Sequence, residues 1–375
     1  MPPLSIYIHV PFCQRKCHYC DFNTYAGIDH LIPPYVDALL TEVRNWAGLA
    51  EGHRVTTVFL GGGTPSLLSG AQMQAVLDAC RTSFSLVPGP EITIEANPGT
   101  VSPGKLEQYQ KAGVNRISFG AQSFDPGELA WLGRIHSEAQ VAEAVAQARQ
   151  AGFQRLNLDL IYGLPGQSTA RWEANVGQAL SLGPEHLSLY ALSVEEGTPL
   201  AGWVASGRTP EPDPDVAADH YLAADAMLSA AGFDNYEISN WARPGEACRH
   251  NLTYWENRPY LGLGAGAHGC FGGFRYHNVL LPQEYIQRLS ANNAASNTRR
   301  RPFIDMAGRM AASSPVAGIN RVEPAEDLLD TLTLGLRLAR GIGFDDFQTR
   351  HDVDLRDLYR TVIAETEALG LLLER

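Results

Sequence analysis

The chain is poor in cysteine, and half of its cysteines are grouped. Six cysteines occur in 375 residues, three of them within residues 13–20 and three isolated. Such a distribution excludes the disulfide framework of a small secreted protein. Grouped thiols in a reducing compartment more often bind metal than form disulfides, whereas isolated ones are usually small buried apolar residues.

Long apolar runs and a basic leader are also missing. No run of roughly 18 uninterrupted apolar residues occurs, which is the length that a membrane-spanning helix needs. The first residues, MPPLSIYIHVPF, have neither the basic start nor the long apolar stretch of a signal peptide. We therefore expect a cytoplasmic protein without a transmembrane segment.

Positive charge is scarce as well. The formal net charge is -12, and the densest basic group is Arg299, Arg300 and Arg301. A nucleic-acid-binding protein normally carries a basic patch or stripe, so this class is disfavoured. Hydrophobic residues make up 45% and charged residues 19% of the chain. These fractions are typical of a globular protein with a large core, here one large α/β domain and a smaller one.

What the sequence does contain is a regular alternation of strand and helix patterns. Helical patterns such as residues 33–48 and 137–152 separate short β-rich runs, and Val141, Val145 and Ala148 form one apolar stripe. Six βα units in order predict a parallel sheet with helices outside, either open or an incomplete barrel. The predicted strands are residues 4–10, 54–60, 91–97, 114–120, 156–163 and 186–194.

The unusual residues follow the predicted strands, where ligands bind in such folds. The cysteine group follows the first strand, and the next four strands are followed by GGGTP (61–65), Asn97-Pro98, GAQSF (120–124) and YGLPGQ (162–167). Glu95 and Asp159 alternate into otherwise apolar strands. Because an unpaired buried carboxylate is costly, we expect both to face a ligand inside the sheet.

The cysteine group lies in IHVPFCQRKCHYCDFN, residues 8–23, with C-x3-C-x2-C spacing. Cys13, Cys17 and Cys20 can hold three corners of a [4Fe–4S] cube and leave one iron open for a substrate. S-adenosylmethionine (SAM) can occupy that iron through its amino and carboxylate groups, which predicts radical chemistry. A Cys3His zinc site completed by His9 or His18 is the alternative.

The βα rhythm ends near residue 197. We predict a (β/α)6 core over residues 1–240, a glycine- and aromatic-rich extension over 241–300, and a small helical module over 301–375. The extension favours loops and strands over a further βα unit. The last module ends at LGLLLER and is expected to be abbreviated.

Five motifs together resemble one family. YIHVPFCQRKCHYCDF, GGGTP, IEANP, RISFGAQSF and NLDLIYGLPGQ occur in this order. They are similar to radical SAM proteins of the branch that contains the oxygen-independent coproporphyrinogen III dehydrogenase HemN and the haem chaperone HemW. The resemblance covers nearly the whole chain. It implies an incomplete radical SAM barrel, a winged-helix-like C-terminal module, a [4Fe–4S] cluster and SAM.

The resemblance also implies roles for individual residues. SAM would contact Tyr7, Tyr19, Gly62, Gly63, Thr64, Glu95, Gln122, Arg134 and Asp159. The alternative for the glycines is an ordinary tight turn, and for Asp159 a structural cap. The resemblance leaves the catalytic residues unassigned.

A further motif, HNLTYW (250–255), matches the HNxxYW pattern of HemW-type proteins. The resemblance implies that His250, Asn251, Tyr254 and Trp255 bind haem, since imidazole ligates haem iron and aromatic rings can cover a porphyrin. The alternative is an aromatic segment packed under the barrel, with His250 making hydrogen bonds. His268 in GAGAHG is a second candidate ligand.

Phe22 separates the two members of this branch. The dehydrogenase has an additional cysteine at this position and a longer segment before the motif, whereas here twelve residues precede Cys13. The sequence therefore favours a haem chaperone that delivers haem to an acceptor haemoprotein, which could be membrane-associated, and that takes electrons from a donor. The rival functions are coproporphyrinogen III dehydrogenase and a radical SAM enzyme acting on RNA or protein.

Overall fold

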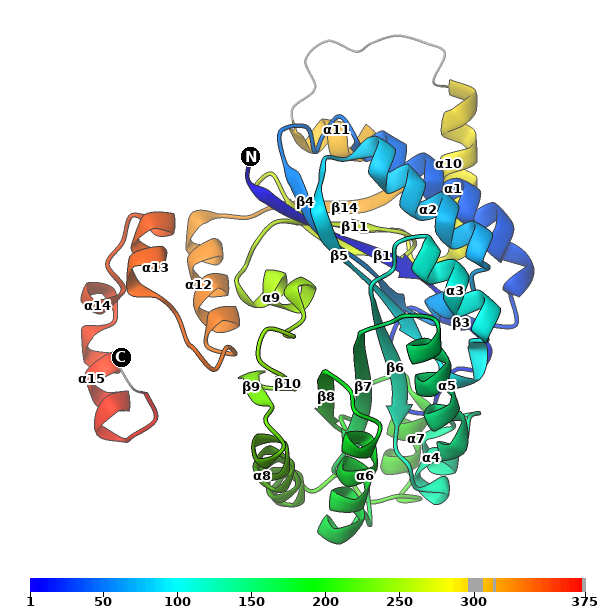
Figure 1. Cartoon of the computed structure of the whole chain (residues 1–375). Helices are drawn as coiled ribbons and strands as arrows, with labels where there is room; N and C mark the ends of the chain where they lie inside the picture. Colours follow the sequence, from blue (N-terminus) through cyan, green and yellow to red (C-terminus); the bar gives the residue numbers. More distant parts are fainter. Residues whose placement is uncertain (296–305, 313–314, 373–375) are drawn as a thin grey trace.

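The computed structural model describes residues 1–295, 306–312 and 315–372 (Figure 1). Its centre is one mixed sheet of twelve strands, ordered β14-β13-β12-β11-β1-β4-β5-β6-β7-β8-β10-β9. A second, two-stranded sheet joins β2 (Phe12–Cys13) to β3 (Tyr25–Ala26) on either side of the cysteine loop. The chain therefore has the predicted α/β class.

The six middle strands are parallel and adjacent in chain order, as the sequence predicts for an incomplete barrel. Their apolar residues point outward and their polar residues inward, because successive side chains of a strand face opposite sides. On β7, for example, Leu156, Leu158 and Leu160 are buried under helices, while Asn157 and Asp159 face the interior. The six strands are β1 (Pro3–Val10), β4 (Arg54–Gly62), β5 (Leu86–Ala96), β6 (Arg116–Gln122), β7 (Arg155–Tyr162) and β8 (His186–Ala191).

Helices cover the outer face of these strands (Figure 1). The predicted stripe Val141, Val145 and Ala148 is buried on α5, and Ser137 caps that helix in a capping box with Gln140. The apolar stripe therefore fixes which face packs on the sheet. The covering helices are α1 (Ile32–Trp46), α2 (Gly70–Ser83), α3 (Pro103–Lys111), α4 (Pro126–Leu132), α5 (Glu138–Gln150) and α6 (Thr169–Ser181).

The sheet continues beyond both ends of the six-stranded core, which the sequence did not predict. At one end β11 (Tyr260–Leu263) pairs in parallel with β1, and β12 (His268–Phe271), β13 (Phe274–Asn278) and β14 (Val316–Arg321) follow antiparallel. At the other end β10 (Asn240–Ala242) and β9 (Asp234–Glu237) add antiparallel strands to β8. Strands from residues 234–321 thus extend the core on both sides.

The remaining helices lie between and after these strands. The HNxxYW segment forms α9 (Arg249–Trp255) inside the expected loop-and-strand extension. The others are α7 (Pro199–Ala205), α8 (Pro214–Ala230), α10 (Pro282–Ala295), α11 (Met306–Ala312), α12 (Pro324–Gly335), α13 (Phe344–His351), α14 (Leu355–Leu358) and α15 (Arg360–Ala368), with short 3-10 turns at Asp29–Leu31, Pro65–Leu67 and Pro98–Thr100.

The C-terminal region is helical, as expected, and stands beside the barrel in Figure 1. It begins after β14, which belongs to the main sheet. The proposed boundary between residues 300 and 301, and the basic group Arg299, Arg300 and Arg301, lie outside the described residues.

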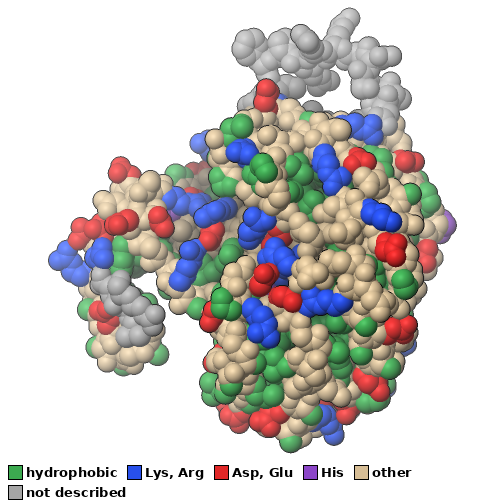
Figure 2. Space-filling model, in the orientation of Figure 1, with side chains coloured by type: hydrophobic (Ala, Val, Ile, Leu, Met, Phe, Trp, Pro, Cys, Tyr) green, Lys and Arg blue, Asp and Glu red, His purple; other side chains and the backbone are tan. Residues whose placement is uncertain are grey.

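Two surface properties complete the description. Among residues 1–295, 306–312 and 315–372, none of the helices combines the length and the apolar character needed to cross a membrane. On the face shown in Figure 2, acidic and basic side chains are intermixed.

Candidate functional site

A cavity of about 460 Å³ opens at the C-terminal ends of the parallel strands. It brings together the residues that the sequence singled out at separate strand ends. Cys13, Cys17 and Cys20 line it. So do all the predicted SAM residues except Tyr7, namely Tyr19, Gly62, Gly63, Thr64, Glu95, Gln122, Arg134 and Asp159.

The three cysteines are free thiols, each partly exposed to this cavity. Two of them receive hydrogen bonds: Thr64 Oγ1 donates to Cys13 Sγ at 3.5 Å, and Arg134 Nη1 donates to Cys17 Sγ at 3.3 Å. Burial raises the pKa of the Cys13 and Cys20 thiols. Thiolates at these positions therefore need a positively charged partner, which an iron–sulfur cluster supplies through its iron.

The single-zinc alternative finds no support in this arrangement. His9 donates from Nε2 to the Asn23 carbonyl at 2.9 Å, and its Nδ1 lies 3.0 Å from the Tyr7 hydroxyl. His18 Nδ1 lies 2.8 Å from the Trp131 carbonyl. In the part of the chain that the structure describes, no three His, Cys, Asp or Glu side chains lie close enough to share one ion. The arrangement therefore gives no support to a Cys3His zinc site completed by His9 or His18.

The glycine motif holds the cysteine loop. Gly63 N–H donates to the Val10 carbonyl at 3.0 Å, and Thr64 N–H donates to the Phe12 carbonyl at 2.8 Å. A Cβ at Gly63 would lie 2.7 Å from both carbonyl oxygens, closer than a side chain can approach. Glycine is required here by the protein's own backbone, in addition to any ligand.

Two carboxylates, Glu95 on β5 and Asp159 on β7, line the cavity. Burial, together with the neighbouring Asp159 charge, raises the pKa of Glu95 to about 8. Burial also raises the pKa of Asp159, although it accepts hydrogen bonds from Ser118 at 3.0 Å and Asn157 at 2.7 Å. A buried pair of this kind favours a cationic ligand, because a positive charge offsets the cost of ionising both groups.

Two differences from the sequence predictions concern residues near this cavity. Tyr7 is half-buried, its hydroxyl lies 3.0 Å from His9 Nδ1, and it is not among the residues that line the cavity, so its contact with SAM stays a prediction. Tyr190, Ser193 and Glu195 line it but were not predicted. Tyr190 alternates inward on β8 in step with Ser188, so the two-residue period of the sixth strand could have identified it.

The HNxxYW residues lie at the opposite end of the barrel. His250 is 1% exposed, stacks on Phe59 with ring centroids 5.0 Å apart, and has a pKa lowered to about 3 by burial. Its Nδ1 lies 2.7 Å from Thr57 Oγ1 and its Nε2 lies 2.9 Å from the Tyr254 hydroxyl. The imidazole is therefore neutral, and both its nitrogens are engaged.

The rest of the motif is also covered. The Arg337 guanidinium lies 4.3 Å from the Trp255 ring centroid, and Asn251 follows His250 in the first turn of α9. In this conformation His250 packs against the barrel floor. The role of the motif in haem binding stays a prediction.

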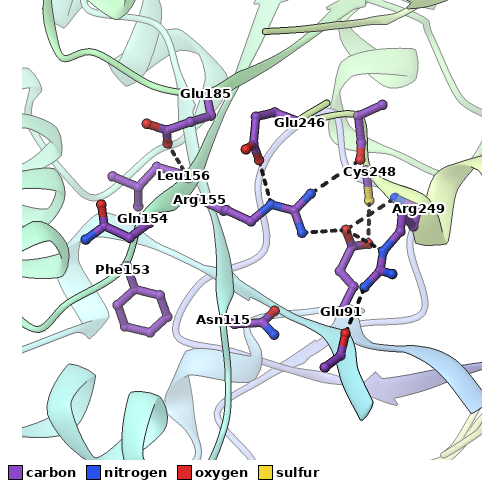
Figure 3. Close-up of polar contacts among 12 residues, drawn as sticks. Glu91, Asn115, Phe153, Gln154, Arg155, Leu156, Glu185, Glu246, Cys248 and Arg249 are labelled. Atoms are coloured by element: carbon purple, nitrogen blue, oxygen red, sulfur yellow. Dashed lines mark hydrogen bonds and ion pairs between the residues drawn. The ribbon is translucent and has the colours of Figure 1, made fainter. Parts of the chain in front are cut away.

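Glu91 fixes α9 to the barrel (Figure 3). Its buried carboxylate accepts the backbone N–H of Arg249 at 3.3 Å and of His250 at 3.0 Å, and pairs with Arg155 at 3.1 Å. These N–H groups belong to the first turn of α9, where no intrahelical acceptor exists. Arg155 is held in turn by Glu246 at 2.7 Å. A polar core therefore replaces apolar packing beneath the cavity.

Comparison with known proteins agrees with this geometry. Residues 7–176 match the family model described as radical SAM superfamily, and residues 322–375 match the HemN C-terminal domain. The protein named heme chaperone HemW of Mycobacterium tuberculosis is 41% identical over 343 residues, covering 91% of this chain and 83% of the relative. The chain belongs to the HemW family of radical SAM proteins. The HemW protein of Escherichia coli is 46% identical over 272 residues, which are 72% of this chain and 70% of that protein.

A solved structure carries the same fold as this HemW-family chain. It is described as coproporphyrinogen III oxidase (HemN) from Escherichia coli, a radical SAM enzyme. The TM-score is 0.80 at 22% sequence identity, and the match covers 98% of this chain and 83% of the other. At this identity the likeness shows the fold alone.

Proposed function

We propose that this protein binds a [4Fe–4S] cluster through Cys13, Cys17 and Cys20 and SAM in the adjoining cavity, and that it delivers haem to acceptor haemoproteins. The observation that carries the first part is the cavity itself. It joins three free thiols to two buried carboxylates at the ends of the parallel strands.

The side chains that line the cavity suit both the cluster and SAM. A cluster held by three thiolates leaves one iron for SAM and, when reduced, supplies the electron that cleaves the SAM sulfonium bond. Glu95 and Asp159 offer negative charge to the cationic ligand, and the Gly62 N–H, which donates to Glu95 at 3.1 Å, orients that carboxylate. Arg134 donates to Cys17 and so acts on the cluster side of the cavity.

Support for haem delivery comes from the relatives. Proteins named heme chaperone HemW match most of this chain at 41% identity in Mycobacterium tuberculosis and 35% identity in Bacillus subtilis. The partners that follow are haem, an acceptor haemoprotein and an electron donor for the cluster. We propose that the protein acts in the cytoplasm and that SAM and the cluster assist transfer.

The alternative is oxidative decarboxylation of coproporphyrinogen III, since the fold matches that of HemN. Phe22 argues against it. This side chain lines the cavity mouth and is 63% exposed at the position where the dehydrogenase has an additional cysteine.

The test uses anaerobically reconstituted full-length protein and two assays. In the first, haem-loaded protein is mixed with an apo-haemoprotein, and transfer is followed by the Soret spectrum of the acceptor. In the second, the protein receives dithionite, SAM and coproporphyrinogen III, and the tetrapyrrole product is analysed. We expect haem transfer and no protoporphyrinogen, with transfer altered in Cys17→Ser. Protoporphyrinogen formation, or failure to bind haem, would overturn the proposal.

A further inference from the structure

A pair of histidines stands on the strands that extend the sheet beyond β1. His268 on β12 and His277 on β13 are cross-strand partners. Their rings stack with centroids 5.4 Å apart and an interplanar angle of 28°. His268 is exposed and His277 is half-buried. Among the described residues, neither ring makes a hydrogen bond to another side chain or to the backbone.

A glycine on the neighbouring strand leaves space for the His277 ring of this pair. His277 faces Gly318 on β14, and a Cβ at Gly318 would collide with the imidazole. Burial and the neighbouring His277 lower the pKa of His268. The His268 ring is therefore neutral near pH 7, and its nitrogen lone pair is available to a metal.

The pair adjoins the cysteine loop. Burial lowers the pKa of His9, and the nearby His268 lowers it further. His9 Nε2 donates to the Asn23 carbonyl at 2.9 Å. The Asn23 side chain in turn donates to the Ala265 carbonyl at 3.1 Å and the Leu280 carbonyl at 3.0 Å. One set of contacts thus joins the histidine strands to the loop that carries Cys20.

The number of protein ligands available at the histidine pair indicates which kind of metal centre could bind there. Within the described residues no three His, Cys, Asp or Glu side chains approach closely enough to share an ion, so a bare ion would have two protein ligands, fewer than the three or four of most zinc sites. Haem iron already has four porphyrin nitrogens and needs only an axial ligand. The neighbouring loops also carry exposed apolar side chains, Leu280 at 55%, Leu281 at 52% and Phe22 at 63%, which suit a macrocycle.

We propose that His268 is the axial ligand of haem iron, with His277 restricting the orientation of its ring, at a site beside the cysteine loop. This inference rests on the proposed haem-delivery function and names the site for it. It assigns the iron ligand to an exposed imidazole, whereas His250 has both nitrogens engaged in the barrel floor.

The test is a haemin titration of the full-length, cluster-loaded protein, followed through the Soret band. The variants are His268→Ala, His277→Ala, His250→Ala and, as a matched control, the exposed His30→Ala. We expect His268→Ala to weaken haemin binding by on the order of tenfold or more and to change the Soret position. Free imidazole should restore the spectrum of His268→Ala, which a purely structural role would not allow. His30→Ala should bind as the unmodified protein does.

Three results would contradict the inference in different ways. Unaltered haemin binding by His268→Ala removes the proposed ligand while leaving haem delivery standing. Absence of haemin binding by the unmodified protein removes the function itself. The third result comes from a Co²⁺ titration followed by its ligand-field absorption bands. If these bands appear with the unmodified protein and are lost in His268→Ala, while haemin binding is unchanged, the pair is a metal-ion site and the haem assignment is overturned.

Discussion

At the scale of single residues, the carboxylates of Glu95 and Asp159 determine which kind of ligand the cavity favours. Glu95 and Asp159 are both half-buried against the cavity, and the charge of Asp159 raises the cost of ionising Glu95. At pH 7 Glu95, with a pKa of about 8, holds a proton. A cationic ligand lowers that pKa, so binding should release the proton and should tighten as the pH rises toward about 8.

The variant Glu95→Gln isolates this effect. We expect SAM affinity to fall by about tenfold, or ~1.4 kcal/mol, and proton release at pH 7 to disappear. Isothermal calorimetry in two buffers of different ionisation enthalpy measures both quantities. Glu107→Gln, on the exposed face of α3, is the control. Undiminished proton release in Glu95→Gln would assign the proton to another group.

Arg134 gives a second residue-scale prediction. Its guanidinium donates to Cys17 Sγ at 3.3 Å and to the Gly120 carbonyl at 2.7 Å. Removing a positive charge and a hydrogen bond from the thiolate stabilises the oxidised cluster. Arg134→Gln should therefore lower the cluster reduction potential, measured by potentiometric titration with EPR detection. Arg171→Gln on α6 is the control, and an equal potential in both variants would contradict the assigned role.

The sequence predicted the site best where a chemically distinctive residue stands at the end of a predicted strand. Cys13, Gly63 and Glu95 each stand at the end of an apolar strand, so strand order alone brings them to one rim. His250 was ambiguous because an imidazole can serve a haem or a polar core, and only burial distinguishes the two. Tyr7 was placed with the ligand residues because the motif contains it, and its contact with SAM stays a prediction.

At the scale of elements, α9 depends on a single carboxylate. Burial opposes ionisation of Glu91, but Arg116 and Arg155 outweigh it, and the pKa is lowered. The stability that Glu91 contributes is therefore present above its unfolded-state pKa and is lost as the pH falls through the lower folded value. α9 should consequently loosen only in strong acid.

Glu91→Gln should destabilise the fold by about 3 kcal/mol or more, because it removes the carboxylate that pairs with Arg155 and offsets the charge of buried Arg116. Urea unfolding followed by circular dichroism measures the loss. Glu246→Gln, in the same network but with a side chain 32% exposed, should cost about 1 kcal/mol or less. Equal losses would show that Glu91 acts as an ordinary surface partner.

The sequence predicted the six core strands well, but it did not predict which strands extend the sheet at its two edges. All six strands of the core coincide with alternating apolar runs, since each buries one face under a helix. By contrast β10 and β11 are short, with three and four residues, and the strands that attach them to the core, β8 and β1, lie far away in sequence. Local patterns do not encode such partners. α9 escaped prediction for the same reason, because its first turn is completed by Glu91 from a distant strand.

At the scale of the whole molecule, buried glutamates make stability depend on pH. Burial raises the pKa of Glu42 to about 7 and of Glu95 to about 8. A raised folded pKa contributes stability that is complete below the unfolded value and is lost as the pH rises through the folded one. Histidines with lowered folded pKa values still titrate in the unfolded state near pH 6.5, so the effect of a glutamate is isolated by comparison with a variant that keeps the same histidines.

We therefore expect the free energy of unfolding of the protein without SAM to fall by about 1 kcal/mol more between about pH 6.5 and 8.5 than that of Glu42→Gln, since only the former releases the Glu42 proton. Urea midpoints across this range measure the change. Glu42→Gln, which retains a partner for Asn278 and Tyr285, should reduce the slope. A steeper slope in that variant would refute the assignment.

The contact between Asn23 and the carbonyls of Ala265 and Leu280 has a consequence for biosynthesis. A chain emerging from the ribosome exposes its cysteines first, but the residues that brace their loop are made more than two hundred positions later. Domains of this size fold only when such long-range partners are present. We therefore expect the cysteine loop to be braced only once translation is complete, so a truncated nascent chain would lack the braced loop.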